Sequence, residues 1–199
     1  MEKNFSLRKF LLYVLIFALV LSAGAGIVVL LIGSWGEYEE KVLLTTGSLG
    51  MYSIFALSCS LLYDRGRYKA FALAGPLVSA LGYLLMLVLI WGERDSVEVL
   101  WKYEGSLGIA AFTLAHSCLL LLLVPRHALV RWLLSLTLFF NACFALLCII
   151  ILLTEYDGEN DFWYRLIGIF AILGVLGAIL TPLIQRFVIP APDKGPEAG

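Results

Sequence analysis

Charged residues are scarce in this chain, and the scarcity argues against an ordinary water-soluble domain. Only 15% of the 199 residues are Asp, Glu, Lys or Arg, whereas soluble domains average about a quarter. Hydrophobic residues make up 61% of the chain, and the mean hydropathy is +0.95. A soluble fold of this size could not bury so many apolar residues, so we expect lipid to surround much of the protein. The basic residues form no stripe of the kind that binds nucleic acid, so nucleic acid is not an expected partner.

Cysteine is also scarce, and its placement argues against a disulfide framework. The four cysteines all lie in apolar runs, and none belongs to a C-x-x-C pair: Cys59, Cys118, Cys143 and Cys148. Cysteine in such a setting behaves as a small buried hydrophobe. We therefore expect neither a disulfide framework nor a zinc site.

The motifs of common catalytic sites are missing from the chain. It contains no G-x-S-x-G, H-E-x-x-H, P-loop or G-x-G-x-x-G pattern. No Asp, Glu, Lys or Arg falls in the middle of an apolar run, although such intramembrane charges usually mark function. The sequence therefore predicts a protein that is not an enzyme and that holds no cofactor and no metal.

Long apolar runs are what the chain does contain. Six of them have, or nearly have, the roughly 20 residues that a helix needs to cross a bilayer. They are Phe10–Gly33, Val42–Tyr63, Ala70–Trp91, Ser106–Val124, Trp132–Leu153 and Leu166–Ile184. The connections are short, so consecutive helices should be antiparallel neighbours. We expect an all-α, polytopic transmembrane helical bundle with six spans, in which residues 1–188 form a single transmembrane domain.

The first run shares features with a cleaved signal peptide. Its start is basic, and Ala23-Gly24-Ala25 resembles a cleavage site of small residues. The apolar run nevertheless continues through Ile27–Ile32. We therefore expect the first helix to remain uncleaved.

Basic residues are concentrated on one side of the expected bundle. Ten of the fourteen Lys and Arg fall on the side that holds both ends of the chain. By the positive-inside rule, the N- and C-termini should be cytoplasmic. The expected location is a cell membrane, namely a bacterial plasma membrane, with multiple passes. Residues 189–199 contain three prolines, and we expect them to form a flexible cytoplasmic tail.

Acidic residues gather on the opposite side, where eleven of the fifteen fall. We assign Glu98 and Glu104 to these outer loops. The other nine define a candidate outer acidic face: Glu37, Glu39, Glu40, Glu93, Asp95, Glu155, Asp157, Glu159 and Asp161. Such carboxylates could bind a divalent cation, dock a basic partner or simply form a solvated cap.

Tryptophans mark the outer ends of the apolar runs. The four at this level are Trp35, Trp91, Trp101 and Trp163. Amphipathic rings prefer the headgroup region, so we interpret these residues as interface anchors.

Two outer stretches resemble each other in sequence. WGEYEEKVLLTTGSLG begins at Trp35, and WGERDSVEVLWKYEGSLG begins at Trp91. Matching glycines and arginines extend the similarity with a period of about 60 residues: Gly50, Gly108 and Gly168, then Arg67, Arg126 and Arg186. The pattern predicts three parallel-repeated helical hairpins, residues 10–67, 70–126 and 131–186, which could close into a compact bundle with rough threefold symmetry. Chance similarity between apolar segments is the alternative.

Small residues recur at helical spacing in three of the runs. They are Ala18, Ser22 and Gly26, then Gly75, Ser79 and Gly82, then Gly174 and Ala178. Helices in lipid associate where small residues let their backbones approach, so we expect these positions to pack against neighbours. Pro76 and Pro182 lie inside runs and should kink them.

His116 and Asn141 are the strongly polar residues expected at depth, and they form a possible intramembrane polar site. His116 could carry a proton or bind a metal, or it could be a neutral imidazole hydrogen-bonded to another helix. Asn141 could line a substrate cavity, or it could join two helices. Neither zinc nor haem is favoured, because His116 has no second intramembrane histidine or ligand cluster beside it.

These observations favour a non-catalytic integral membrane protein, acting as an accessory, scaffold or assembly component. The alternative is a small transporter or channel for a neutral or hydrophobic solute, since no charge is available for ion coupling. The expected partners are the lipid bilayer and either another membrane protein or a second copy of the chain.

Overall fold

Six α-helices make up nearly all of the chain that the structure describes, which is residues 7–32, 36–66, 68–92, 97–125, 127–154 and 162–188 of a computed structural model. The helices are α1 (Leu7–Ile32), α2 (Glu37–Asp64), α3 (Lys69–Trp91), α4 (Val97–Leu121), α5 (Ala128–Thr154) and α6 (Phe162–Leu183). A short π-helical segment, η2 (Ile184–Val188), continues α6. The described ranges contain no strand. The expected all-α architecture is confirmed.

Five of these helices are long and apolar enough to cross a membrane: Glu37–Asp64, Lys69–Trp91, Val99–Leu121, Ala128–Thr154 and Phe162–Phe187. The apolar part of α1 is shorter, Leu12–Val28. Lipid offers no hydrogen bonds to the backbone, so an apolar chain satisfies its N–H and C=O groups by forming helices. The protein is a helical membrane bundle.

The outer surface of the bundle is apolar. Large side chains such as Phe17 on α1, Leu77 on α3 and Ile172 on α6 are exposed. Helices α2 and α4 are the most buried spans, whereas α5 and α6 are the least buried. The exposed apolar side chains place the bundle in contact with the lipid bilayer.

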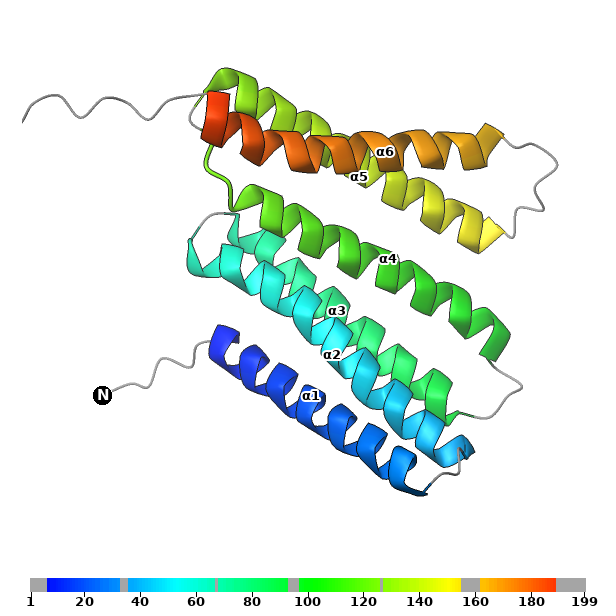
Figure 1. Ribbon diagram of the computed structural model, residues 1–199. Coiled ribbons are helices and arrows are strands. Elements are labelled where there is room, and N and C mark those ends of the chain that lie inside the picture. The colour runs from blue at the N-terminus through cyan, green and yellow to red at the C-terminus, as the bar shows by residue number, and fades with distance from the viewer. Residues whose placement is uncertain are drawn as a thin grey trace, which may run out of the picture.

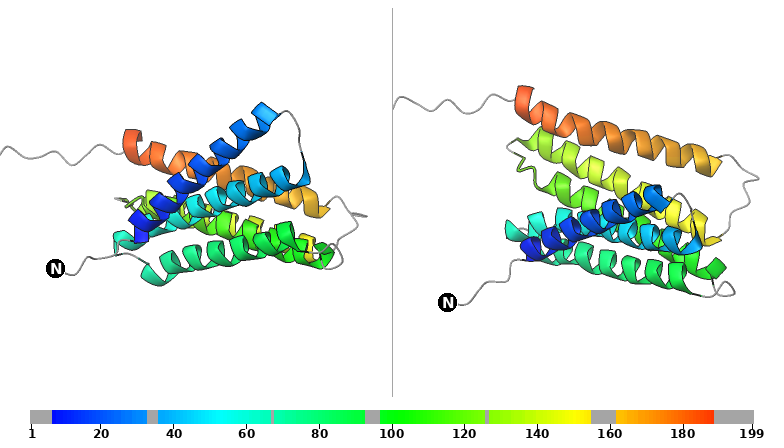
Figure 2. Two further views of the ribbon diagram at one scale, coloured as in Figure 1. Left: turned by 90° about the horizontal axis from the view of Figure 1, so that it is seen from below. Right: turned by 60° about the horizontal axis from the view of Figure 1, so that its bottom comes forward.

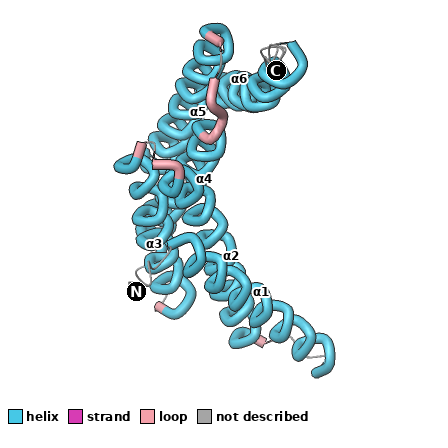
Figure 3. Tube along the Cα trace, turned by 90° about the vertical axis from the view of Figure 1, so that its left-hand side faces the viewer, coloured by secondary structure: helices cyan, strands magenta, loops and turns pink. Residues whose placement is uncertain are grey.

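Helices α2, α3 and α4 form the centre of the structure, because each packs along the other two. Their buried cluster contains Cys59 and Leu62 of α2, Ala72 of α3 and Cys118 of α4. Helix α1 packs on α2, α5 packs on α4, and α6 packs on α5. The helices therefore lie in an elongated row, with α1 at one end and α6 at the other (Figure 3).

The expected threefold arrangement is wrong. In the described ranges, neither α1 nor α2 makes an extensive contact with α5 or α6, so the first and third hairpins do not pack closely on each other. Lipid tails are as apolar as a leucine side chain, so a helix in a bilayer gains no hydrophobic energy from a second neighbour. Helix α1 crosses α2 at an inclination and ends the row (Figure 2). The repetition of the three hairpins stays a prediction.

Close packing by small residues is confirmed on α3. A Cβ atom added at Gly75 would overlap Sγ of Cys59 and would lie 2.6 Å from its Cβ. A Cβ at Gly82 would lie 2.7 to 2.8 Å from the ring of Tyr52. Glycine at these two positions lets α3 approach α2 closely, which holds the centre of the bundle together.

The second expected kink coincides with a change of helix type. Pro182 lies near the end of α6, and the π-helical segment begins two residues later. Proline has no N–H to donate, so it cannot continue the regular hydrogen-bond ladder. Fully buried Thr181 donates its hydroxyl to the carbonyl of Gly177 at 2.6 Å.

Candidate functional site

A buried hydrogen bond joins α2 to α4. The hydroxyl of Tyr52 donates to Oε1 of Glu104 at 2.7 Å. Tyr52 is 2% exposed and Glu104 is 8% exposed. A buried tyrosine hydroxyl needs a hydrogen-bond partner, and the carboxyl supplies it.

A glycine of α3 makes room for Tyr52, and a glycine of α4 lies beside its hydroxyl. The ring packs against Gly82 of α3, and a Cβ at Gly108 of α4 would lie 3.5 Å from the Tyr52 hydroxyl. All three central helices therefore meet at the Tyr52–Glu104 pair.

The assignment of Glu104 to an outer loop is wrong. Helix α4 begins at Val97, so Glu104 lies about two turns inside the helix and on its buried side. We predicted the span from Ser106, because acidic residues ordinarily mark the end of an apolar run. Here the carboxyl is tolerated because Tyr52 satisfies it.

A line of rings connects this pair with His116. Tyr52 and Phe55 have centroids 6.0 Å apart, Phe55 and Phe112 have centroids 5.9 Å apart, and both pairs are edge-on. Phe112 then stacks on His116, with centroids 6.3 Å apart. These distances lie in the favourable range for aromatic pairs. The line of rings runs from α2 to the side of α4 that carries Phe112 and His116.

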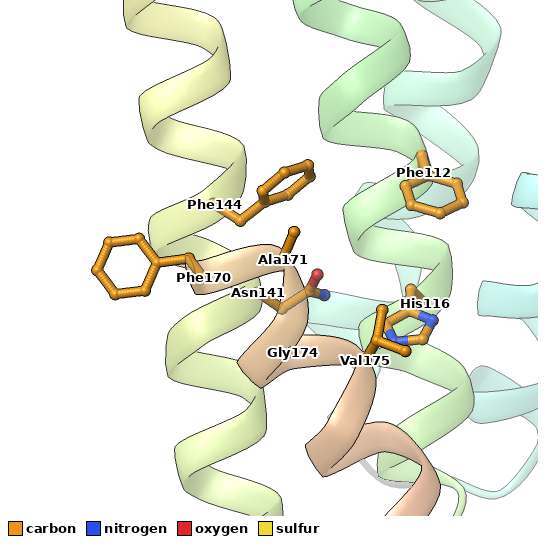
Figure 4. A pocket seen from close by; sticks show the side chains of 8 residues that line it. All are labelled: Phe112, His116, Asn141, Phe144, Phe170, Ala171, Gly174 and Val175. Carbon is orange, nitrogen blue, oxygen red and sulfur yellow. The ribbon is translucent and has the colours of Figure 1, made fainter. Parts of the chain in front are cut away.

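His116 and Asn141, the two residues of the possible intramembrane polar site, line the same cavity. The cavity has a volume of about 180 Å³ and lies between α4, α5 and α6. Its other lining residues are Phe112, Phe144, Phe170, Ala171, Gly174 and Val175. Figure 4 shows Asn141 reaching from α5 toward α4, where His116 lies. The residues that we placed at depth thus lie at one site.

Asn141 joins two helices. Its Nδ2 donates to Oγ of Ser117 on α4 at 3.1 Å, and both side chains are buried. The bond fixes α5 beside α4. His116 differs, because the residues that the structure describes give its ring no hydrogen-bond partner. The expected bond from His116 to a neighbouring helix is therefore not formed within these residues.

Ser117→Ala should lower the free energy of unfolding by about 1 kcal/mol. The substitution removes the acceptor of the Asn141 amide, and interhelical hydrogen bonds in membranes average about 0.6 kcal/mol with a maximum near 1.7 kcal/mol. Ser135→Ala is the matched control, because Ser135 is exposed on α5. Denaturation in mixed micelles measures both. Equal stability of the two variants would show that the bond contributes nothing.

The described part of the outer acidic face is helical. Glu37, Glu39 and Glu40 form the first turn of α2, where the helix dipole favours negative charge. Glu37 also pairs with Lys41 at 3.0 Å. These three residues were expected in a loop, and the helix begins earlier than we predicted. The other six members lie between described ranges, at Glu93 and Asp95 and at Glu155, Asp157, Glu159 and Asp161.

Three of the four tryptophans fall in described helices, while Trp35 lies outside the described residues. Trp91 ends α3, Trp101 lies in the second turn of α4, and Trp163 lies in the first turn of α6; all three are exposed. Trp91 also donates Nε1–H to Thr45 of α2 at 3.1 Å and meets Tyr38 edge-on. It therefore ties α3 to α2. Its role as a membrane anchor stays a prediction.

Two side chains that the sequence analysis did not propose as site residues form hydrogen bonds with the segment that follows α4. Arg65, just after α2, donates Nη1–H to the carbonyl of Leu122 at 2.7 Å. Gln185 of η2 donates Nε2–H to the carbonyl of Val124 at 2.8 Å. These two carbonyls lie just past Leu121, the last residue of α4, where no further helical turn supplies N–H donors, and the two side chains supply the donors instead. The polar residues just past the C-terminal ends of α2 and α6 were the available signal.

Metal ligands do not gather in the residues that the structure describes. No group of three or more His, Cys, Asp or Glu side chains lies together there. The described site therefore consists of the two interhelical pairs and the cavity beside them.

Comparison with known protein families, with curated proteins and with solved structures finds no match to this chain.

Proposed function

We propose that the protein is a non-catalytic, multi-pass membrane protein that serves as an accessory, scaffold or assembly component. The observation that carries this proposal is the use of polar groups at depth. Glu104 accepts a hydrogen bond from Tyr52, and Asn141 donates one to Ser117. A catalytic or ion-coupling site needs ionisable groups that face a path or a substrate. Pairing between helices supports a structural use of Glu104 and Asn141.

The exposed side of the α5–α6 hairpin supports a role in assembly. Among the described elements, the extensive contact of helix α6 with another helix is with α5, and its apolar side chains Ile172 and Ile179 are exposed. We propose that another membrane protein or a second copy of the chain packs on this side. Van der Waals packing of this kind is how helices associate in lipid.

We further propose that both termini are cytoplasmic and that the membrane is a bacterial plasma membrane. Helix α1 begins and α6 ends at the same end of the bundle, which supports one common side for the two termini (Figure 1). The excess of Lys and Arg on that side supports a cytoplasmic assignment.

Photocrosslinking in native membranes tests the assembly role. A benzoylphenylalanine placed at exposed Ile172 should give one discrete adduct, and the same partner should co-purify in mild detergent. Buried Leu134 of α5 is the matched control position, and it should give no such adduct. If Ile172 captures no protein, or if the adduct partner never co-purifies, the assembly role is contradicted.

A small transporter for a neutral or hydrophobic solute is the second candidate. The cavity at His116 and Asn141 favours it, because none of the eight described residues that line it carries a fixed charge. Tracer flux of glycerol into proteoliposomes, above empty liposomes and lost in Asn141→Leu, would support transport. Flux equal to that of empty liposomes would count against it.

A further inference from the structure

We propose that the cavity between α4, α5 and α6 binds a neutral, single-ring aromatic molecule that carries a hydroxyl or carbonyl group. The proposal goes beyond the assembly role and does not rest on it. Four features of the cavity support it, namely its volume, its walls, its one imidazole and the empty space at Gly174.

The volume suits one substituted ring. The cavity measures about 180 Å³, and an apolar protein cavity of about 150 Å³ holds benzene. A ring with a small substituent therefore fits, whereas a multi-ring lipid does not.

The walls suit an aromatic occupant. Phe112 of α4 and Phe144 of α5 lie on two sides of the cavity (Figure 4). Phe112 is already stacked on His116. Aromatic rings are stabilised by such neighbours beyond simple burial. A planar ring that enters this space meets both phenylalanine and imidazole faces.

The polar group in the cavity selects a hydrogen-bonding substituent. His116 is half-buried, and no residue within the described ranges bonds to its ring nitrogens. A neutral imidazole offers one donor and one acceptor, so it can bond to a hydroxyl or to a carbonyl. None of the eight lining residues carries a fixed charge, so an ionic occupant would lose its hydration without compensation.

The opening of the cavity faces the lipid. Phe112 is 52% exposed and Val175 is 60% exposed, and both lie in membrane-spanning helices. A molecule dissolved in the bilayer therefore reaches the cavity from the side.

Gly174 gives the clearest evidence that the cavity has free space for a bound molecule. Gly177, one turn further along α6, shows the usual use of glycine, because a Cβ there would overlap the Thr137 hydroxyl and lie 3.0 Å from its Cβ. A Cβ at Gly174 would meet no atom of another described helix within 4 Å, although Gly174 is buried and lines the cavity. The missing side chain of Gly174 leaves room for a bound molecule, whereas that of Gly177 leaves room for a neighbouring helix.

Fluorine NMR of the full chain in nanodiscs tests the proposal, with 4-fluorophenol and fluorobenzene as probes. The wild type should broaden the 4-fluorophenol signal saturably, beyond the effect of empty nanodiscs. Gly174→Leu should raise the Kd at least tenfold by filling the cavity. Gly168→Leu should change the Kd less than twofold, because Gly168 lies on the same helix with equally open surroundings but outside the cavity.

His116→Leu tests the hydrogen bond separately. It should weaken 4-fluorophenol about fivefold, which is the value of one neutral hydrogen bond, and it should leave fluorobenzene within twofold. If Gly174→Leu does not fold, Gly174→Ala should still raise the Kd for 4-fluorophenol about threefold. The proposal would be overturned by the absence of saturable binding or by equal affinities for the two probes. It would also be overturned if the Gly174 variant that folds bound 4-fluorophenol as tightly as the wild type does.

Discussion

Gly75→Leu is expected to destabilise the folded bundle strongly. Gly75 of α3 faces fully buried Cys59 of α2, and even a Cβ atom there would overlap Sγ. A leucine side chain would force the two central helices apart. Overpacking of a closed core costs about 1–3 kcal/mol, and occasionally more. We expect no monodisperse peak in size-exclusion chromatography, or else a much lower unfolding temperature.

A compensating substitution at Cys59 and a control variant at Gly168 make this prediction more specific. Gly75→Ala alone should destabilise the protein, and adding Cys59→Gly should restore much of the loss by returning the space. Gly168→Leu introduces the same large side chain on α6, where a Cβ meets nothing within 4 Å, and it should fold normally. A Gly75→Leu protein with wild-type yield and unfolding temperature would contradict the close approach of α3 to α2.

Tyr52→Phe should lower the free energy of unfolding by about 1–3 kcal/mol. The substitution removes the donor that satisfies the buried carboxyl of Glu104, and an unsatisfied buried polar group costs about that amount. Glu104→Leu should also be destabilising, because it leaves the Tyr52 hydroxyl without its acceptor. Denaturant unfolding in mixed micelles, followed by tryptophan fluorescence, gives the values.

The double variant Tyr52→Phe/Glu104→Leu decides whether the two groups act together. It should lose less than the sum of the two single variants, because the second substitution removes a group that already lacks its partner. Tyr63→Phe is the matched control on α2, where the ring is partly exposed, and it should change stability by less than about 0.5 kcal/mol. Strict additivity of the two single effects would show that the bond adds nothing.

The fold class was predictable because it depends on composition along the chain. Apolar runs of about 20 residues identify membrane helices without any knowledge of their neighbours. The glycines of α3 were predictable for a similar reason, since small residues at helical spacing usually mark close contacts. His116 and Asn141 were found because polar side chains stand out in an apolar run.

Glu104 was missed because hydropathy cannot separate an acid at a helix end from an acid buried two turns inside. The deciding fact is its partner, Tyr52, which lies 52 residues earlier in the chain. A tyrosine in the middle of an apolar run was the available signal, because its buried hydroxyl needs a partner. The row of helices was missed because the repeat describes hairpins one at a time and does not specify how they pack on each other.

Chemical crosslinking at Cys59 tests the central claim, that the helices form a row in which α4 joins the last hairpin to the rest. In a closed threefold bundle, the repeat spacing would place Ala178 of α6 beside Cys59 and Cys118. With Cys143 and Cys148 replaced by serine, molecular iodine, a small apolar oxidant, should oxidise the adjacent thiols of Cys59 and Cys118 to a disulfide in native membranes. In a second variant that also lacks Cys118, it should not link Cys59 to Ala178→Cys. Linkage of Cys59 to position 178, without linkage to Cys118, would contradict the account.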